Sequence, residues 1–211
     1  MDKILEDIGK YRIVPVIVID DADDSIPLAQ ALIESGLPIA EVTFRTKTAK
    51  ESIEKIAKMF PEMYLGAGTV LTVEQVKNAV ESGAKYIVSP GINLKVVEYC
   101  CTENIPMIPG IATPTEIGMA LEFNMEVVKY FPAEPLGGIN YLKAISAPYD
   151  NLRFIPTGGI DEKNIITYLQ FPKVLACGGS WMVKSDLIKN KKFNEIKNLA
   201  IEALKIVKSV N

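Results

Sequence analysis

Short runs of β-branched and aromatic residues alternate along the chain with longer stretches of helical periodicity. The apolar runs predict eight strands, over residues 13–19, 39–44, 63–68, 85–90, 105–110, 127–131, 153–157 and 173–178. Between them, apolar residues recur every three or four positions, which is the spacing of amphipathic helices. Strand and helix repeated eight times within about 200 to 250 residues is typical of the closed (β/α)8 barrel, or TIM barrel.

Start and stop signals support the predicted helices. Thr113 is followed by Pro114 and, three residues after the threonine, by Glu116. This pattern is a capping box with proline at the first helical position. Gly36 and Gly83 stand where two other helical patterns end, as expected for glycine after a helix.

We interpret residues 1–211 as a single domain, a (β/α)8 TIM barrel with an extra N-terminal helix that covers the bottom of the barrel. The alternative is an open doubly wound sheet, which a GxGxxG motif after the first strand would favour. The residues after that strand are 20-DDADD-24, which contain no glycine. No Pro- or Ser-rich linker and no low-complexity segment interrupts the pattern.

The composition narrows the possible chemistry. The chain contains no histidine, which excludes histidine general bases, Ser–His or Cys–His nucleophiles and histidine metal ligands. Its three cysteines, Cys100, Cys101 and Cys177, form no CxxC motif. An odd number of cysteines without that motif indicates neither a disulfide framework nor a zinc site, and fits a reducing cytoplasm.

The charge gives no sign of a polyanionic partner. The formal net charge is −3, so neither nucleic acid nor a membrane surface is expected as a partner. The first residues carry no signal-peptide-like apolar stretch, and no run approaches transmembrane length. We therefore expect a cytoplasmic location.

A lysine interrupts the run 126-EVVKYFP-132, which otherwise has the composition of a buried strand. Burying an unpaired ammonium is costly, so Lys129 needs a partner, contact with water or an easily lost proton. In 41-EVTFRT-46, side-chain alternation places Glu41 and Arg45 on one face. Inside a barrel these three side chains would converge, and the residues alone are equally compatible with a structural ion pair and with a catalytic group.

The catalytic interpretation is specific. A lysine sheltered from water loses its proton more easily, and the neutral amine forms a Schiff base with a ketone. The protonated imine then accepts electrons, so a neighbouring carbon–carbon bond can break or form. Glu41 would move the protons, and Arg45 would hold a carboxylate with two hydrogen bonds.

Glycine pairs end the last two predicted strands, in 157-TGGI-160 and 178-GGS-180. In (β/α)8 barrels the loops after strands seven and eight frequently form a phosphate site. Ser180 would add a hydroxyl group. Together with the lysine, the glutamate and the arginine, these loops predict a 2-keto acid with a phosphate at its far end as the substrate.

Six motifs along the chain are EVTFRT, GAGTVLT, IVSPG, KYFPAE, FIPTGGI and CGGSW, in this order. Together these motifs resemble those of the 2-keto-3-deoxy-6-phosphogluconate (KDPG) aldolases, bifunctional enzymes that also cleave 4-hydroxy-2-oxoglutarate. The resemblance runs from the first predicted strand to the eighth. It implies a metal-independent class I aldolase without a cofactor, assembled as a homotrimer. The products would be pyruvate and glyceraldehyde 3-phosphate.

The resemblance also implies a role for individual residues at the reacting end. Lys129 matches the Schiff-base lysine, Glu41 the proton-transferring glutamate and Arg45 the carboxylate-binding arginine. The other matching positions line the pyruvyl end or lie beside the lysine; they are Thr69, Pro90 and Phe131.

At the far end of the substrate, the phosphate loop matches Gly158, Gly159, Gly179 and Ser180. Thr157 favours a KDPG aldolase over its galactonate-specific relative, in which a valine is expected. The chain departs from the family pattern at Lys184, where a proline is common. An extra cation there would change affinity for the phosphorylated end.

Other functions remain open on the sequence alone. A phosphosugar isomerase would use Glu41 as a base and Lys129 only electrostatically, and a binding protein would keep the phosphate loops without turnover. A metal-dependent aldolase would need a carboxylate cluster at the strand ends, which the sequence does not contain. The preferred substrate among KDPG, its galactonate isomer and 4-hydroxy-2-oxoglutarate is not determined.

Overall fold

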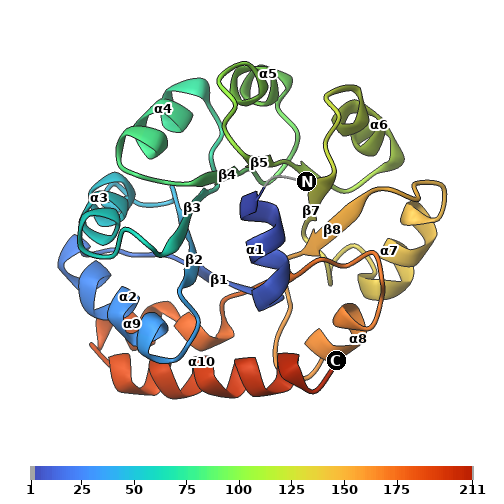
Figure 1. Ribbon diagram of the computed structural model, residues 1–211. Coiled ribbons are helices and arrows are strands. Elements are labelled where there is room, and N and C mark those ends of the chain that lie inside the picture. Colours follow the sequence, from blue (N-terminus) through green and yellow to red (C-terminus); the bar gives the residue numbers. More distant parts are fainter. Residues whose placement is uncertain (1–2, 211) are drawn as a thin grey trace.

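The computed structural model describes residues 3–210. Strands stand in a circle and helices surround them (Figure 1). The strands are β1 (Ile13–Ile17), β2 (Ile39–Thr43), β3 (Tyr64–Gly68), β4 (Tyr86–Val88), β5 (Met107–Ile108), β6 (Gly110–Ile111), β7 (Val127–Tyr130), β8 (Arg153–Pro156) and β9 (Cys177–Gly179).

One helix precedes β1, and the others lie between the strands or follow β9. They are α1 (Lys3–Tyr11), α2 (Ser25–Glu34), α3 (Ala49–Met59), α4 (Val73–Glu81), α5 (Leu94–Thr102), α6 (Pro114–Glu122), α7 (Gly138–Ser146), α8 (Ile165–Leu169), α9 (Ser185–Lys189) and α10 (Phe193–Lys208), with 3-10 turns η1 (Ala22–Asp24) and η2 (Trp181–Val183).

The predicted capping signals form as expected. At the start of α6, the Thr113 side chain accepts from the Glu116 backbone, and the Glu116 side chain accepts from the Thr113 backbone. Gly36 and Gly83 have φ values of +85° and +97°, the left-handed conformation that ends helices. Local sequence therefore sets these helix boundaries.

The prediction of a closed eight-stranded barrel is wrong. The parallel strands form a curled six-stranded sheet in the order β5-β4-β3-β2-β1-β9 and a separate three-stranded sheet in the order β6-β7-β8. The strands follow the circle seen in Figure 1, but the hydrogen-bonded ladder is not continuous around it.

Two breaks explain the difference. The fifth predicted strand, 105–110, is divided at Pro109 into β5, which pairs with β4, and β6, which pairs with β7. Proline has no N–H group to donate to a ladder, so it interrupts pairing in the middle of a sheet. The segments that contain β8 and β9 are joined by two isolated bridges, Phe154↔Val174 and Thr157↔Gly178, and not by a ladder.

The buried hydrophobic side chains form one cluster. Helix α1 lies over the centre of the circle of strands (Figure 1), and its Leu5 and Ile8 are buried. Ile8 borders a small internal space together with Glu41 and Lys129. Helix α1 thus covers one end of the interior in which these two polar side chains lie.

The interpretation of residues 1–211 as one domain stays a prediction. Within residues 3–210, no helix has both the length and the apolar character needed to cross a bilayer.

Candidate active site

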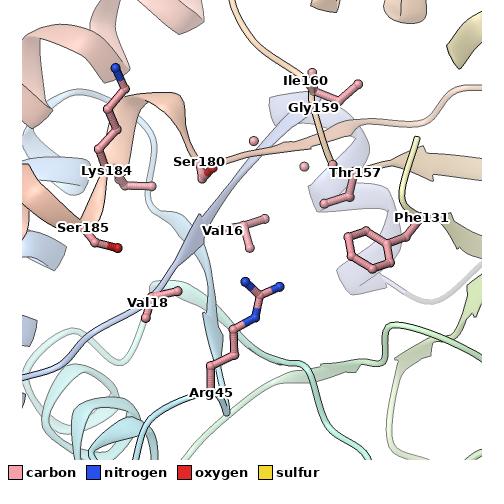
Figure 2. A pocket seen from close by; sticks show the side chains of 14 residues that line it. Val16, Val18, Arg45, Phe131, Thr157, Gly159, Ile160, Ser180, Lys184 and Ser185 are labelled. Carbon is pink, nitrogen blue, oxygen red and sulfur yellow. The ribbon is translucent and has the colours of Figure 1, made fainter. Parts of the chain in front are cut away.

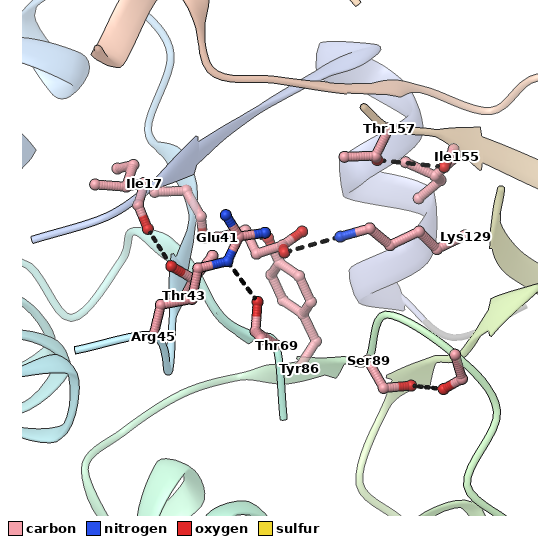
Figure 3. A network of polar contacts seen from close by, with 12 residues as sticks. Ile17, Glu41, Thr43, Arg45, Thr69, Tyr86, Ser89, Lys129, Ile155 and Thr157 are labelled. Carbon is pink, nitrogen blue, oxygen red and sulfur yellow. Dashed lines mark hydrogen bonds and ion pairs between the residues drawn. The ribbon is translucent and has the colours of Figure 1, made fainter. Parts of the chain in front are cut away.

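Lys129 and Glu41 point toward each other in the interior of the circle of strands (Figure 3). Lys129 comes from β7 and Glu41 from β2, and their Nζ and Oε1 atoms are 3.1 Å apart. Only 5% of Lys129 and 4% of Glu41 is exposed. The lysine in the middle of an apolar strand therefore has a partner, and that partner is the predicted glutamate.

Glycines on β3 make room for this pair. A Cβ atom on Gly68 would lie 2.1 Å from Oε1 of Glu41, and one on Gly66 would lie 2.2 Å from the ring of Tyr86. Strand β3 pairs with β2 on one side and β4 on the other. The space that larger side chains on β3 would fill is thus occupied by the Glu41 carboxylate from β2 and by the Tyr86 ring from β4.

Tyr86 forms one wall beside the carboxylate. Its hydroxyl donates to the backbone carbonyl of Ala40 over 3.1 Å. Burial raises the pKa of Tyr86 well above its ordinary value, and the neighbouring Glu41 carboxylate raises it further. Tyr86 therefore stays a neutral hydrogen-bond donor, and it fixes the wall against which Glu41 packs.

Arg45 follows the end of β2 and reaches towards the mouth of the site. Its Nε atom donates to Oγ1 of Thr69 over 3.3 Å, as drawn in Figure 3. Thr69 has a φ of +56°, an uncommon conformation for a residue that is not glycine. This turn after β3 brings the threonine hydroxyl to the arginine, so the structure brings these two predicted residues together.

A cavity of about 490 Å³ opens beside Arg45. Figure 2 shows the Arg45 guanidinium and the Phe131 ring pointing into it. Its lining comes from the loops after several strands; the residues are Val16, Val18, Arg45, Phe131, Thr157, Gly158, Gly159, Ile160, Gly178, Gly179, Ser180, Val183, Lys184 and Ser185.

The predicted phosphate loop lines one side of this cavity. Gly158 and Gly159 have φ values of +99° and +81°, which side-chain-bearing residues rarely adopt. A Cβ atom on Gly179 would lie 1.9 Å from the Trp181 ring. Ser180, between this glycine and the tryptophan, is exposed to the cavity. The two glycine loops therefore come together at one side of the cavity.

The cavity and the buried ion pair adjoin each other. Nζ of Lys129 lies 5.4 Å from the centre of the Phe131 ring, and Phe131 lines the cavity. Thr157, also in the lining, is almost fully buried. Lys129 and Glu41 are not in the lining itself but belong to the layer of side chains below it.

Pro90 and Thr69 are also outside the lining of the cavity. Pro90 follows β4, and its carbonyl oxygen would lie 2.2 Å from a Cβ atom on Gly110. The backbone of Pro90, after the end of β4, therefore packs closely against Gly110 of β6. The structure thus gives Pro90 a packing contact and gives Thr69 the bond to Arg45.

Sequence reasoning did not select several residues that line the cavity. They are Val16, Val18, Ile160, Val183 and Ser185. For Val16 and Val18 a signal existed, because alternation along 13-IVPVIVI-19 places them on one face at the carboxyl end of the strand. Lys184 lines the cavity, but Figure 2 shows its ammonium directed away from Arg45.

Within residues 3–210, no group of three or more His, Cys, Asp or Glu side chains is arranged to hold a metal ion.

The sequence and the fold match known aldolases. The profile of the KDPG and KHG aldolase family matches residues 4–199. The chain is 47% identical to the 2-dehydro-3-deoxy-phosphogluconate aldolase of Treponema pallidum, over 98% of this chain and 99% of that protein. It is 40% identical to the KHG/KDPG aldolase of Escherichia coli K12, over 91% of this chain and 90% of that protein.

The fold is also similar to that of a solved KDPG aldolase. The crystal structure of the KDPG aldolase from Legionella pneumophila, with pyruvate captured at low pH as a covalent carbinolamine intermediate, matches with a TM-score of 0.92 and 38% identity, covering 95% of this chain and 98% of that chain. The resemblance seen in the six sequence motifs is confirmed, and the chain belongs to the KDPG and KHG aldolase family.

Proposed function

We propose that this protein is a class I aldolase, a lyase that cleaves KDPG to pyruvate and glyceraldehyde 3-phosphate through an imine on Lys129. One observation carries the assignment of the lysine. Lys129 is the buried amine of the interior, it lies 3.1 Å from a carboxylate, and it adjoins a cavity with an arginine and two glycine loops.

The reaction begins with the amine. Glu41 is within hydrogen-bond reach of Nζ, so it can accept a proton from the ammonium. The neutral amine attacks the C2 ketone of the substrate, and Glu41 returns its proton to the hydroxyl of the carbinolamine, which leaves as water and gives a protonated imine. The lysine of the cavity lining itself, Lys184, directs its ammonium away from Arg45.

The carbon–carbon bond then breaks. Glu41 removes the proton from the C4 hydroxyl, the C3–C4 bond electrons move to the imine nitrogen, and glyceraldehyde 3-phosphate leaves as the aldehyde. The enamine that remains takes a proton at C3, and water hydrolyses the imine to release pyruvate and the free lysine. One glutamate thus performs the proton transfers in a chain that has no histidine.

Different residues bind the two ends of the substrate. Arg45 holds the substrate carboxylate, with Thr69 fixing the guanidinium through its hydroxyl. Phe131 covers the lysine, and Pro90 closes the pyruvyl end. The phosphate group sits among Gly158, Gly159, Gly179 and Ser180, where glycine lets the backbone approach an anion closely. Thr157 lies between the two ends and directs specificity towards the gluconate-derived substrate.

A second activity, cleavage of 4-hydroxy-2-oxoglutarate to pyruvate and glyoxylate, is supported by the name of the Escherichia coli relative. That substrate shares the 2-keto acid end and needs no phosphate loop. We further propose one domain, a homotrimeric assembly, a cytoplasmic location and catalysis without cofactor or metal.

Borohydride reduction in the presence of pyruvate tests the central step. Reduction converts the imine into a stable amine, and peptide mass mapping should place the pyruvyl adduct on Lys129, with and without EDTA. Lys129→Ala should lose both the adduct and KDPG cleavage, while Lys85→Ala, which changes a partly buried lysine elsewhere, should keep both. An adduct on another lysine would contradict the assignment, and absence of any adduct would favour an isomerase or a binding protein.

A further inference from the structure

Hydrogen bonds hold the turn that carries Gly158 and Gly159 on the side away from the cavity. The backbone N–H of Glu134 donates to the Gly158 carbonyl over 3.0 Å. The side chain of Asn164 donates from Nδ2 to the Gly159 carbonyl over 2.9 Å. Neither Glu134 nor Asn164 lines the cavity, so both carbonyls point away from it.

This orientation fixes the direction of two backbone donors. In a trans peptide the C=O and the following N–H point in opposite directions. With the Gly158 and Gly159 carbonyls directed away, the N–H groups of Gly159 and Ile160 face the cavity that these residues line. No acceptor within residues 3–210 bonds to these two N–H groups, so they are available to an anion.

Asn164 is the side chain that bridges this turn. Its Oδ1 accepts from the Asp161 N–H over 3.0 Å while its Nδ2 donates to Gly159. The same side chain thus holds the peptide before Ile160 and the peptide after it. Asn164 occupies the position that caps α8, yet its side chain makes no hydrogen bond to the helix.

From this geometry we propose that Asn164 is a positioning residue for substrate binding. It holds the Ile160 N–H group towards the phosphate group, beside the Gly159 N–H group that the bond from Glu134 orients, without touching the substrate. The inference rests on the proposed function, because that function places a phosphate in this cavity. Asn164, at the N-cap position of α8, thus acts on the substrate only through the backbone of the turn.

Two variants separate positioning from folding. Asn164→Ala removes both side-chain bonds. Asn164→Asp keeps the acceptor for the Asp161 N–H but replaces the donor to Gly159 with a carboxylate oxygen, so it retains half of the bridge. Asn151→Ala is the matched control, because Asn151 is an exposed asparagine of the turn before β8.

Three measurements are made on each variant: steady-state cleavage of KDPG, the rate of borohydride trapping with pyruvate, and the rise in melting temperature caused by inorganic phosphate. Both Asn164 variants should raise KM for KDPG about tenfold or more, with kcat changed little. Both should reduce the stabilisation by phosphate and trap pyruvate at the wild-type rate, since pyruvate does not reach the turn. Asn151→Ala should behave as wild type.

Unchanged KM and unchanged phosphate stabilisation in both variants would overturn the proposal. A loss of pyruvate trapping in step with the rise in KM would also overturn it, because that pattern indicates general damage to the site. If the wild-type protein did not cleave KDPG, the proposed function would fail. Inorganic phosphate would still test Asn164 through the melting temperature.

Discussion

Lys129 and Glu41 stand 88 positions apart in the chain and form a buried hydrogen-bonded ion pair of 3.1 Å. Both charges are withdrawn from water, and breaking such a pair by removing one partner is costly. The pair joins β7 of the three-stranded sheet to β2 of the six-stranded sheet. The same two side chains that we propose for catalysis therefore also link the two sheets.

Glu41→Gln should separate imine formation from proton transfer. The amide keeps the size of the side chain but cannot take a proton, so kcat for KDPG should fall by about 10² to 10⁴. Trapping of pyruvate on Lys129 by borohydride should persist but be slower, because the amide no longer accepts the proton of the ammonium. The uncompensated ammonium should lower the free energy of unfolding by on the order of 3 kcal/mol, measured by urea titration. Glu62→Gln, at an exposed position, is the control, and a wild-type kcat in Glu41→Gln would refute the assigned role.

Arg45→Lys tests whether the guanidinium binds the carboxylate through two hydrogen bonds. Lysine keeps the charge but offers a single point of contact, so KM for KDPG should rise by about 10- to 100-fold. The bond to Thr69 would be lost with it. Steady-state kinetics give the result, with Arg153→Lys as the control because Arg153 is exposed at the start of β8. Equal changes in both variants would argue against a carboxylate site at Arg45.

Gly68→Ala tests whether the catalytic geometry depends on the empty position on β3. The added Cβ would lie 2.1 Å from Oε1 and 2.6 Å from Cγ of Glu41, so the carboxylate must move away from Lys129. Activity should fall by at least about 100-fold, and overpacking should cost about 1 to 3 kcal/mol of stability.

Gly118→Ala is the matched control for that substitution. A Cβ atom on Gly118, within α6, would meet nothing within 4 Å. Alanine in a helix is favoured over glycine by about 0.5 to 1 kcal/mol, so this variant should be fully active and as stable as wild type or slightly more so. An active Gly68→Ala enzyme would show that Glu41 has freedom that the structure does not indicate.

Buried thiols should make the protein sensitive to alkali. Burial raises the pKa of Cys100 from 9.0 to about 12, and burial also raises the pKa of Cys177. Between pH 9 and about pH 12, the Cys100 thiol loses its proton in the unfolded chain and keeps it in the folded chain. The stability contributed by the protonated thiol is therefore complete below pH 9 and is lost as pH rises towards 12, with a slope of up to about 1.4 kcal/mol per pH unit.

Urea titrations at several pH values above 8 measure this slope. Cys100→Ala should make it less steep, whatever the cost of the substitution at neutral pH. The adjacent Cys101 is exposed, so Cys101→Ala should reduce the slope less. An identical pH dependence in wild type and Cys100→Ala would contradict the expected contribution of this thiol.

Much of the architecture was readable from local patterns. The Thr113–Glu116 capping box and the glycines that end helices depend on residues a few positions apart, and they formed as expected. The alternation that placed Glu41 inside and the glycine pairs at the strand ends also depend only on neighbours in the chain. These features were predictable because short-range sterics and hydrogen bonding determine them.

The sequence by itself determined the family, the order of strands and helices, and the residue types available for chemistry in a chain without histidine. Only the tertiary structure decided that the ladder breaks at Pro109 and that Lys129 meets Glu41 below the cavity. It alone placed Asn164 behind the turn that carries Gly158 and Gly159. These outcomes depend on distances between residues far apart in the chain, which the packing of strands against one another sets and which no local pattern contains.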